Sequence, residues 1–241
     1  VLLPPMEGKY VTRLSNEHKL IDGLINHLPD CHYYNFRMSP HFDNWLPFYW
    51  RGFEQTSWYT YVIPDLSDLE DIWDSMRSNI RREIRKAKKQ LTVDRENDYD
   101  TLLELVSKTY DRQGEDPSFD YNVLRRVCKA SVERDQGRMF FARDDEGRVH
   151  SGLLLVWDDR VSYYLVGGSD PALRTSGAAS LLMWEAMQFS QERVTAFNFE
   201  GSMIRSIERF FRAFGGRQQV YFRLSKYQPK ILKIGSDLFS G

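Results

Sequence analysis

The chain has 241 residues, of which 41% are hydrophobic and 14% aromatic, so it can bury a large core and lacks the composition of a disordered protein. Its 33 basic and 34 acidic residues give a net charge of -1, so no whole-molecule field attracts nucleic acid and any anion site must be local. Cys31 and Cys128 match neither a disulfide framework nor metal spacing, and no apolar run approaches the ~18 residues of a membrane span, so we expect a reduced, cytoplasmic protein without a metal or a membrane span.

The first 66 residues indicate mixed structure. Apolar spacing from Leu14 to Leu28 predicts a helix, with Ser15 or Asn16 as its N-cap. Two strands are predicted at residues 32–37 and 58–63, and the Trp-, Pro- and Gly-rich residues 44–53 between them predict an ordered loop.

A single helix is predicted over residues 67–90, with Ser67 as its cap. One apolar stripe runs along it, acidic residues gather near its start, and a dense basic cluster that includes Arg81 and Arg82 lies near its end. The basic cluster has two interpretations. It is either a solvated helix face or an anion-binding edge in which Arg81 and Arg82 contact the substrate.

The remaining elements follow in a defined order. From Leu91 the pattern predicts a strand, two helices, a three-strand meander, a helix, a strand, a helix and a last strand. The predicted ranges are 91–93, 99–112, 121–134, 138–143, 150–157, 160–166, 178–192, 195–199, 204–214 and 220–224. A hairpin meander followed by strand–helix–strand crossovers predicts an α/β fold with a mixed sheet and helices on its faces.

The loop after the third meander strand carries the pattern R-x-x-G-x-A, from Arg174 to Ala179. A helix start offers free backbone N–H groups and the positive end of its dipole, and small residues let a phosphate approach. The predicted phosphate-binding residues are Arg174, Ser176, Gly177, Ala178 and Ala179. The alternative is an ordinary capped helix whose small residues serve packing.

This element order resembles the GNAT acyltransferase fold, in which such a turn binds the pyrophosphate of acyl-coenzyme A. The segments FNFEGSMIRSIERFFRAFGG, WLPFYWRGF, WYTYVIPDL and SNIRREIRKAKK resemble the FemAB-like branch of that superfamily. Fem-like proteins contain two GNAT-like halves, so the resemblance implies a partial N-terminal half at residues 1–66 and a GNAT-like domain at residues 67–241. Asn198 stands where that branch has Asp, which puts any carboxylate role at this position in doubt.

Acyl transfer to an amine requires positioning, a donor for the developing oxyanion and a route for the proton. Glu200 follows a predicted strand, where it could hold or deprotonate an amine, although it could instead cap the next helix. Tyr164 is the predicted acid, with packing as the alternative. Asn198 and Ser202 are predicted to contact the acceptor.

Three functions remain open from the sequence. The first is transfer from acyl-coenzyme A, such as acetyl-CoA, to a small-molecule or peptide amine. The second is a Fem-type transfer from aminoacyl-tRNA to a cell-wall precursor, which the basic helix and the two-half organisation favour. The third is a non-catalytic GNAT-like module.

Overall fold

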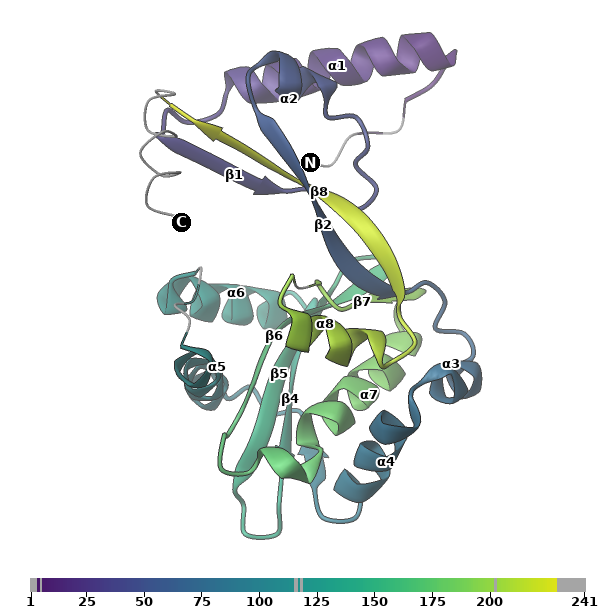
Figure 1. The fold of residues 1–241 in the computed structure, drawn as a ribbon, viewed down its shortest axis with the longest axis vertical. Coiled ribbons are helices and arrows are strands. Elements are labelled where there is room, and N and C mark those ends of the chain that lie inside the picture. The colour runs from purple at the N-terminus through teal and green to yellow at the C-terminus, as the bar shows by residue number, and fades with distance from the viewer. Residues whose placement is uncertain (1–3, 5, 115–116, 118, 202, 229–241) are drawn as a thin grey trace. The chain divides into compact units, whose positions relative to one another are not determined.

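The computed structural model describes residues 4, 6–114, 117, 119–201 and 203–228 (Figure 1). The helices are α1 Tyr10–Asn26, α2 Leu46–Trp50, α3 Leu69–Ser75, α4 Ser78–Ala87, α5 Tyr99–Gln113, α6 Tyr121–Glu133, α7 Ala178–Gln191 and α8 Arg205–Arg212, with the 3-10 helix η1 at Arg174–Ser176. The strands are β1 Tyr33–Arg37, β2 Glu54–Ile63, β3 Thr92–Asp94, β4 Gly137–Arg143, β5 Val149–Trp157, β6 Val161–Ser169, β7 Ala196–Asn198 and β8 Arg217–Tyr227. Over the part of the chain described, no helix is long and apolar enough to cross a membrane.

The chain forms two compact units. One consists of residues 60–218, and the other combines residues 1–59 with residues 219–241. Strands β2 and β8 each contribute residues to both units. The expected division into residues 1–66 and 67–241 concerned descent from two GNAT-like halves, which compactness does not test, so it stays a prediction.

The larger unit is built on a mixed sheet with the strand order β2-β7-β6-β5-β4-β3. Strands β3 to β6 form an antiparallel meander, whereas β6 and β7 are parallel. This mixture confirms the predicted fold class. It follows from the connections, because a hairpin makes neighbouring strands antiparallel and a crossover helix makes them parallel.

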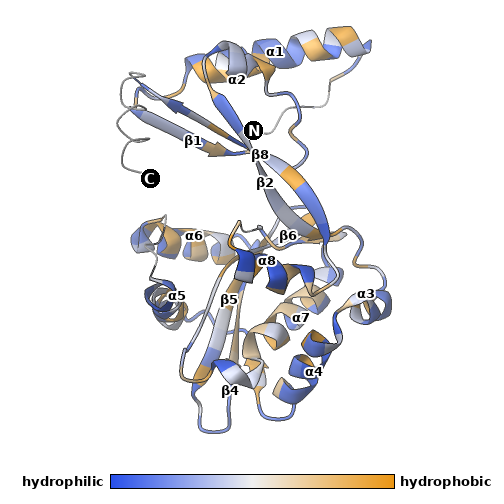
Figure 2. Cartoon of the chain, in the orientation of Figure 1, coloured by the Kyte–Doolittle hydropathy of each residue, from blue (hydrophilic) through white to orange (hydrophobic). Residues whose placement is uncertain are grey.

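Helices cover both faces of this sheet, because the meander strands are apolar on both sides. Phe140 and Leu155 point into a core shared with α3, α4, α7 and α8. Phe141 and Leu154 point the opposite way, into a core shared with α5 and α6. On the first face, α4 and α7 lie side by side (Figure 1). The α4 ribbon is largely hydrophilic with hydrophobic bands, as expected for a helix that buries one stripe (Figure 2).

The smaller unit has its own core. Strand β1 pairs antiparallel with β8, and the strand order in this unit is β1-β8-β2. Ile21 of α1 and Phe48 of α2 pack on one face of these strands together with Tyr34, Phe53 and Leu224. An isolated small sheet needs such a covered apolar face for stability.

The single helix predicted at residues 67–90 is wrong, because it is interrupted at Met76 and Arg77. Both residues have extended backbone, with ψ angles of 145° and 141°. The N–H of Arg77 bonds to the carbonyl of Ala213 at 2.9 Å, so a contact distant in sequence replaces a helical hydrogen bond. Asp68, and not Ser67, caps the first piece by accepting two backbone N–H groups.

Three boundaries in the N-terminal part also differ from prediction. The first helix begins at Tyr10 rather than Leu14, with Lys9 as its N-cap. The expected loop at residues 44–53 contains α2, whose first turn includes Pro47, a residue that suits that position. Strand β2 begins at Glu54 rather than Trp58, which shows that pairing overrides the polar composition of its first residues.

Candidate active site

Strands β6 and β7 pair over only three residues and then part. The parallel register joins Val161 to Ala196 and ends where Tyr163 faces Asn198. Strand β7 stops there, whereas β6 continues to Ser169. Over the described residues, the β6 edge beyond Tyr163 therefore lacks strand pairing on the β7 side.

A bulge lies in the same stretch of β6. The register with β5 pairs Leu155 with Tyr164 and Leu154 with Val166, so Leu165 is skipped. A bulge leaves the extra residue outside the ladder and re-aims the strand. Leu165 is the residue that this bulge leaves without a register partner on β5.

Two glycines follow the bulge, and close approach explains both. A Cβ at Gly168 would stand 2.2 Å from the carbonyl oxygen of Leu105 in α5. A Cβ at Gly167 would stand 2.5 Å from the Tyr164 hydroxyl. The strand is therefore shaped by α5 on one side and by the Tyr164 phenol on the other.

Tyr164, the predicted acid, is half-buried. Its ring packs edge-on against Phe211 of α8, with centroids 5.8 Å apart. Burial raises the pKa of Tyr164 to about 12, and the nearby Tyr110 acts in the same direction. Tyr164 is therefore neutral at physiological pH and keeps a proton to donate.

The R-x-x-G-x-A turn stands at the start of α7, as predicted. Arg174 and Ser176 lie in η1, Gly177 has a φ of 82°, and α7 begins at Ala178. Ala178 donates its N–H to the Ser176 hydroxyl at 3.3 Å, whereas Arg174 and Ala179 are exposed. A left-handed residue followed by a helix start matches the geometry on which the phosphate prediction rests.

Helix α4 packs against this turn, which the sequence did not indicate. A Cβ at Gly177 would lie 2.7 Å from the carbonyl oxygen of Glu83. Lys86 Nζ donates to the carbonyl of Thr175 at 2.8 Å, and Gln90 donates to that of Ser176 at 3.2 Å. Glu83 and Lys86 lie at i and i+3 on one face of α4, and Gln90 follows three residues after the helix ends.

One contact brings negative charge to the helix start. The Ser180 hydroxyl, in the first turn of α7, donates to the Glu83 carboxylate at 2.7 Å. A carboxylate is favoured at this end of a helix for the same electrostatic reason as a phosphate. The α7 start thus carries Lys86 and Glu83 side by side.

The basic residues of α4 point in different directions. Arg81 forms an ion pair with Asp74 at 3.0 Å, and the Arg85 guanidinium lies over the Trp73 ring. Arg82 is exposed beside Glu83. Within the described part of the chain, no hydrogen bond or ion pair joins Arg81 or Arg82 to the R-x-x-G-x-A turn, so their substrate role stays a prediction.

Side chains alternate between two faces at the end of β7. Phe197 and Phe199 are fully buried in one core, and Asn198 faces the other way. The Asn198 side-chain oxygen accepts hydrogen bonds from the Thr60 hydroxyl at 2.7 Å and from the backbone N–H of Glu200 at 2.8 Å. The amide at this position therefore holds the chain turn through its oxygen.

Glu200 is exposed directly after this strand. Its φ of 61° is unusual for a residue with a side chain, and Gly201 follows at 64°. Such strain concentrates at functional sites, where the surrounding structure enforces it. Ser202, the other predicted contact here, lies outside the described residues.

Tyr163 of β6 is the register partner of Asn198 at the end of β7. Its hydroxyl donates to Asp158 at 3.0 Å. Burial raises the pKa of Tyr163 well above its usual range, and the negative charges of Asp158 and Glu200 act in the same direction. Tyr164, the next residue on β6, packs against Phe211 of α8 instead.

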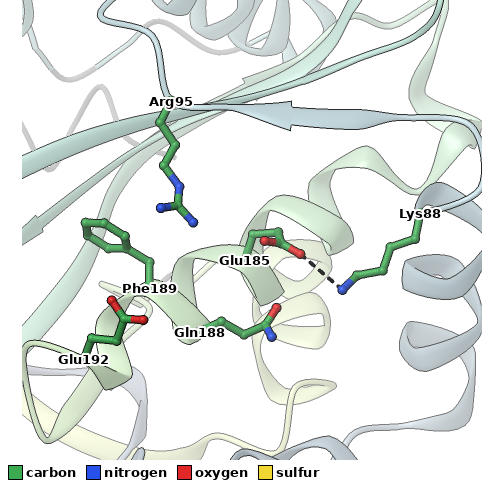
Figure 3. Close-up of a pocket in the computed structure, with 6 residues that line it drawn as sticks. All are labelled: Lys88, Arg95, Glu185, Gln188, Phe189 and Glu192. Atoms are coloured by element: carbon green, nitrogen blue, oxygen red, sulfur yellow. Dashed lines mark ion pairs between the residues drawn. The ribbon is translucent and has the colours of Figure 1, made fainter.

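A separate surface cavity of about 260 Å³ opens beside the C-terminal half of α7 (Figure 3). Lys88 and Glu185 form an ion pair at 3.2 Å along its wall, and Arg95 reaches toward Phe189. The lining residues are Lys88, Arg95, Glu185, Gln188, Phe189 and Glu192, and no predicted site residue that the structure describes is among them. Among the described residues, no group of three or more His, Cys, Asp or Glu side chains is arranged to hold a metal ion.

A family model described as "Acetyltransferase (GNAT) domain" matches residues 74–212, which is more than half of the chain. No curated protein matches the chain. A crystal structure of FemX is similar at a TM-score of 0.71 and 15% identity, covering 93% of this chain and 79% of that one. The C-terminal domain of a putative lysylphosphatidylglycerol synthetase from Agrobacterium fabrum is similar at a TM-score of 0.59 and 13% identity, covering 96% and 79%. L-PGS from Bacillus licheniformis follows at 0.54 and 12%, covering 96% and 78%. At these identities the likeness concerns the fold.

Proposed function

Because this chain belongs to the GNAT acetyltransferase domain family, we propose that it transfers an acyl group from acyl-coenzyme A to an amine. One observation carries the proposal. Over the described residues, the β6 edge beyond Tyr163 lacks strand pairing on the β7 side, and β6 leads through residues 170–173 to the turn at the start of α7, which would let one extended donor contact both. We further propose a small molecule or a peptide as the amine acceptor.

In this proposal the donor pyrophosphate binds at the α7 start, with Arg174 and Lys86 as its cationic partners. The thioester lies along β6, where the backbone N–H of Leu165 donates to its carbonyl oxygen. That hydrogen bond strengthens as negative charge develops on the oxygen in the transition state.

Side chains of this chain supply both proton transfers of the reaction. The neutral amine attacks the thioester carbon, the C–N bond forms and the C–S bond breaks. Tyr164 donates a proton to the leaving thiolate. Glu200 accepts the amine proton, directly or through water, so that Tyr164 and Glu200 serve as acid and base.

The second candidate donor is an aminoacyl-tRNA ester, and Glu83 is the observation in its favour. Its carboxylate lies against the first turn of α7 and repels a pyrophosphate at the same place. An ester donor requires the same acid and base but no pyrophosphate site. The division at residues 66 and 67, the roles of Arg81, Arg82 and Asn198, and a cytoplasmic setting likewise stay proposals.

Ligand-dependent thermal stability separates these donors. Acetyl-CoA, longer acyl-CoAs and free coenzyme A, each at ~100 times its dissociation constant, should stabilise the fold by about 2.7 kcal/mol. Arg174→Ala should weaken coenzyme A binding about tenfold or more, because it removes a charge-assisted hydrogen bond. Arg126→Ala on α6 is the matched control, since Arg126 is also an exposed arginine.

Turnover is then measured as thiol release with a panel of amines. No shift and no turnover with any coenzyme A donor would overturn the first donor assignment, and the same panel is then repeated with aminoacyl-tRNA. Absence of transfer from either donor class would leave the non-catalytic module as the correct function.

A further inference from the structure

The surface cavity beside α7 is lined by charged and polar groups from three parts of the chain (Figure 3). Glu185 and Gln188 lie at i and i+3 on one face of α7, and Glu192 is the C-cap of that helix. Lys88 is the C-cap of α4, and Arg95 directly follows β3. The carboxylates of the cavity thus come from α7 and its end, and its cations come from elsewhere in the chain.

Both carboxylates that line the cavity already have cationic partners. Lys88 Nζ lies 3.2 Å from a carboxylate oxygen of Glu185, and an Arg193 nitrogen lies 3.3 Å from one of Glu192. Arg95 is the third cation beside the cavity, so three positive charges meet two negative ones there. One positive charge remains without a counter-charge, and the cavity therefore favours an anionic ligand.

The unmatched charge belongs to Arg95. Its acidic neighbours in the chain, Asp94 and Glu96, both pair with Arg143, at 2.6 and 3.8 Å. Within the described ranges, no carboxylate forms an ion pair with the Arg95 guanidinium. This group is consequently free to bind the carboxylate of a ligand.

Two aromatic rings orient the Arg95 guanidinium. Its central carbon lies over both rings, 5.0 Å from the Phe189 centroid and 5.3 Å from the Phe140 centroid. Figure 3 shows the guanidinium directed into the space between Phe189 and Glu185. A guanidinium that lies over a ring uses its flat face and leaves the N–H groups of its edge free. A carboxylate binds such an edge through two parallel hydrogen bonds.

Gln188 supplies a second group for recognition. Its side chain is half-buried at the cavity, and its amide forms no hydrogen bond to any residue that the structure describes. An amide offers both N–H donors and a carbonyl acceptor. A hydroxyl group both donates and accepts a hydrogen bond, so a ligand hydroxyl satisfies either side of this amide.

We propose that this cavity binds a small hydroxycarboxylate, with its carboxylate on Arg95 and its hydroxyl groups on Gln188. The cavity volume of about 260 Å³ corresponds to roughly nine waters at ~30 Å³ each, which suits a small molecule and not a peptide. An amino acid fits less well, because Glu185 and Glu192, which could hold its ammonium group, already have cationic partners. The residues differ from those assigned to acyl transfer, so the inference is independent of the proposed function.

Three related compounds test the two halves of this recognition. Threonate carries both a carboxylate and hydroxyl groups, butyrate lacks the hydroxyl groups, and erythritol lacks the carboxylate. Each is titrated into the whole chain by NMR, following the Arg95 Nε–H and the Gln188 side-chain amide, with sodium chloride at equal ionic strength as the reference for general screening. Threonate should shift both resonances saturably. Butyrate should bind about 2- to 10-fold more weakly, and erythritol should not bind.

Arg95→Ala and Arg85→Ala form a matched pair. Arg85 is also exposed and also lies over a ring, 5.3 Å from the Trp73 centroid, but it does not line the cavity. Followed at the Gln188 amide, Arg95→Ala should weaken threonate binding about 10- to 150-fold, as loss of hydrogen bonds to a charged group predicts, and Arg85→Ala should leave it unchanged.

Gln188→Ala tests the hydroxyl contact separately. Followed at the Arg95 Nε–H, it should lower the affinity for threonate to that for butyrate and leave butyrate binding unchanged. Glu192→Gln removes a negative charge from the cavity, so it should strengthen threonate binding. The melting temperature of each variant establishes that it is folded before it is titrated.

The absence of a saturable threonate shift beyond that of sodium chloride would overturn the proposal. Equal threonate affinities of Arg95→Ala and Arg85→Ala would do the same. The hydroxycarboxylate assignment would also be wrong if threonine bound more tightly than threonate and Glu192→Gln weakened it, since the cavity would then recognise an ammonium group.

Discussion

The side-chain oxygen of Asn198 accepts the backbone N–H of Glu200 at 2.8 Å, and this bond accompanies the left-handed backbone of Glu200. The same oxygen accepts the buried Thr60 hydroxyl. Because a carboxylate oxygen could accept both bonds equally well, Asn and Asp can serve the same structural purpose here. The turn at Glu200 is thus compatible with Asn at position 198, where the FemAB-like branch has Asp.

Loss of this acceptor should destabilise the chain. Asn198→Ala leaves the buried Thr60 hydroxyl without its partner, and we expect the free energy of unfolding to fall by about 1–3 kcal/mol. Urea denaturation measures the difference. Adding Thr60→Val to Asn198→Ala should restore part of the loss, since the orphaned hydroxyl is then gone; an unchanged double variant would contradict this account.

Glu200 can be tested with two substitutions that separate charge from backbone strain. Glu200→Gln keeps size and hydrogen bonding, so turnover should fall ~10²-fold or more while the melting temperature stays nearly constant. Glu200→Gly should also lose turnover but gain about 1 kcal/mol of stability, because glycine tolerates a φ of 61°. Turnover and thermal unfolding of both variants decide the matter, and normal turnover in Glu200→Gln would end the catalytic assignment.

The elements that the sequence predicted well are those with a strong local signal. The meander strands at β4, β5 and β6 are continuous apolar runs bounded by Asp- and Gly-containing turns, and such runs have few alternatives. The break at Arg77 had no local signal, because it depends on the distant Ala213 carbonyl. For the same reason, the basic cluster of residues 67–90 could be predicted, but the contact of its Lys86 with the R-x-x-G-x-A turn could not.

Tyr164 should contribute to stability in a pH-dependent manner. Its folded pKa of about 12 exceeds the ordinary value of 10.0, so the folded state favours the neutral phenol. This stabilisation is complete below pH 10 and is lost as the pH rises toward 12. Urea unfolding across this range should show a shallower decline for Tyr164→Phe than for the wild type. Parallel curves for the two proteins would contradict the assigned burial.

Gly177 has a left-handed backbone and also packs closely against α4. Comparison with Gly147, which has only the left-handed backbone, separates the two effects. Gly177→Ala meets both a φ of 82° and the Glu83 carbonyl at 2.7 Å, whereas Gly147→Ala meets a φ of 79° with no neighbour within 4 Å. We expect Gly147→Ala to cost about 1–2 kcal/mol and Gly177→Ala at least 1 kcal/mol more. Chemical denaturation compares them, and equal costs would mean that α4 moves aside without penalty.

Lys86 offers the sharpest test of how α4 serves the turn. Its ammonium group donates to the Thr175 carbonyl at 2.8 Å, so it stands beside the α7 start without requiring any movement. Lys86→Met removes the charge but keeps most of the chain length, and coenzyme A affinity should fall about tenfold. Lys89→Met removes another exposed charge, two residues after the end of α4, and should leave affinity unchanged. Calorimetric titration of both variants at low and high salt distinguishes a direct contact from general attraction, because general attraction is screened similarly for the two lysines. Equal losses in the two variants would show that α4 contributes only its overall positive charge.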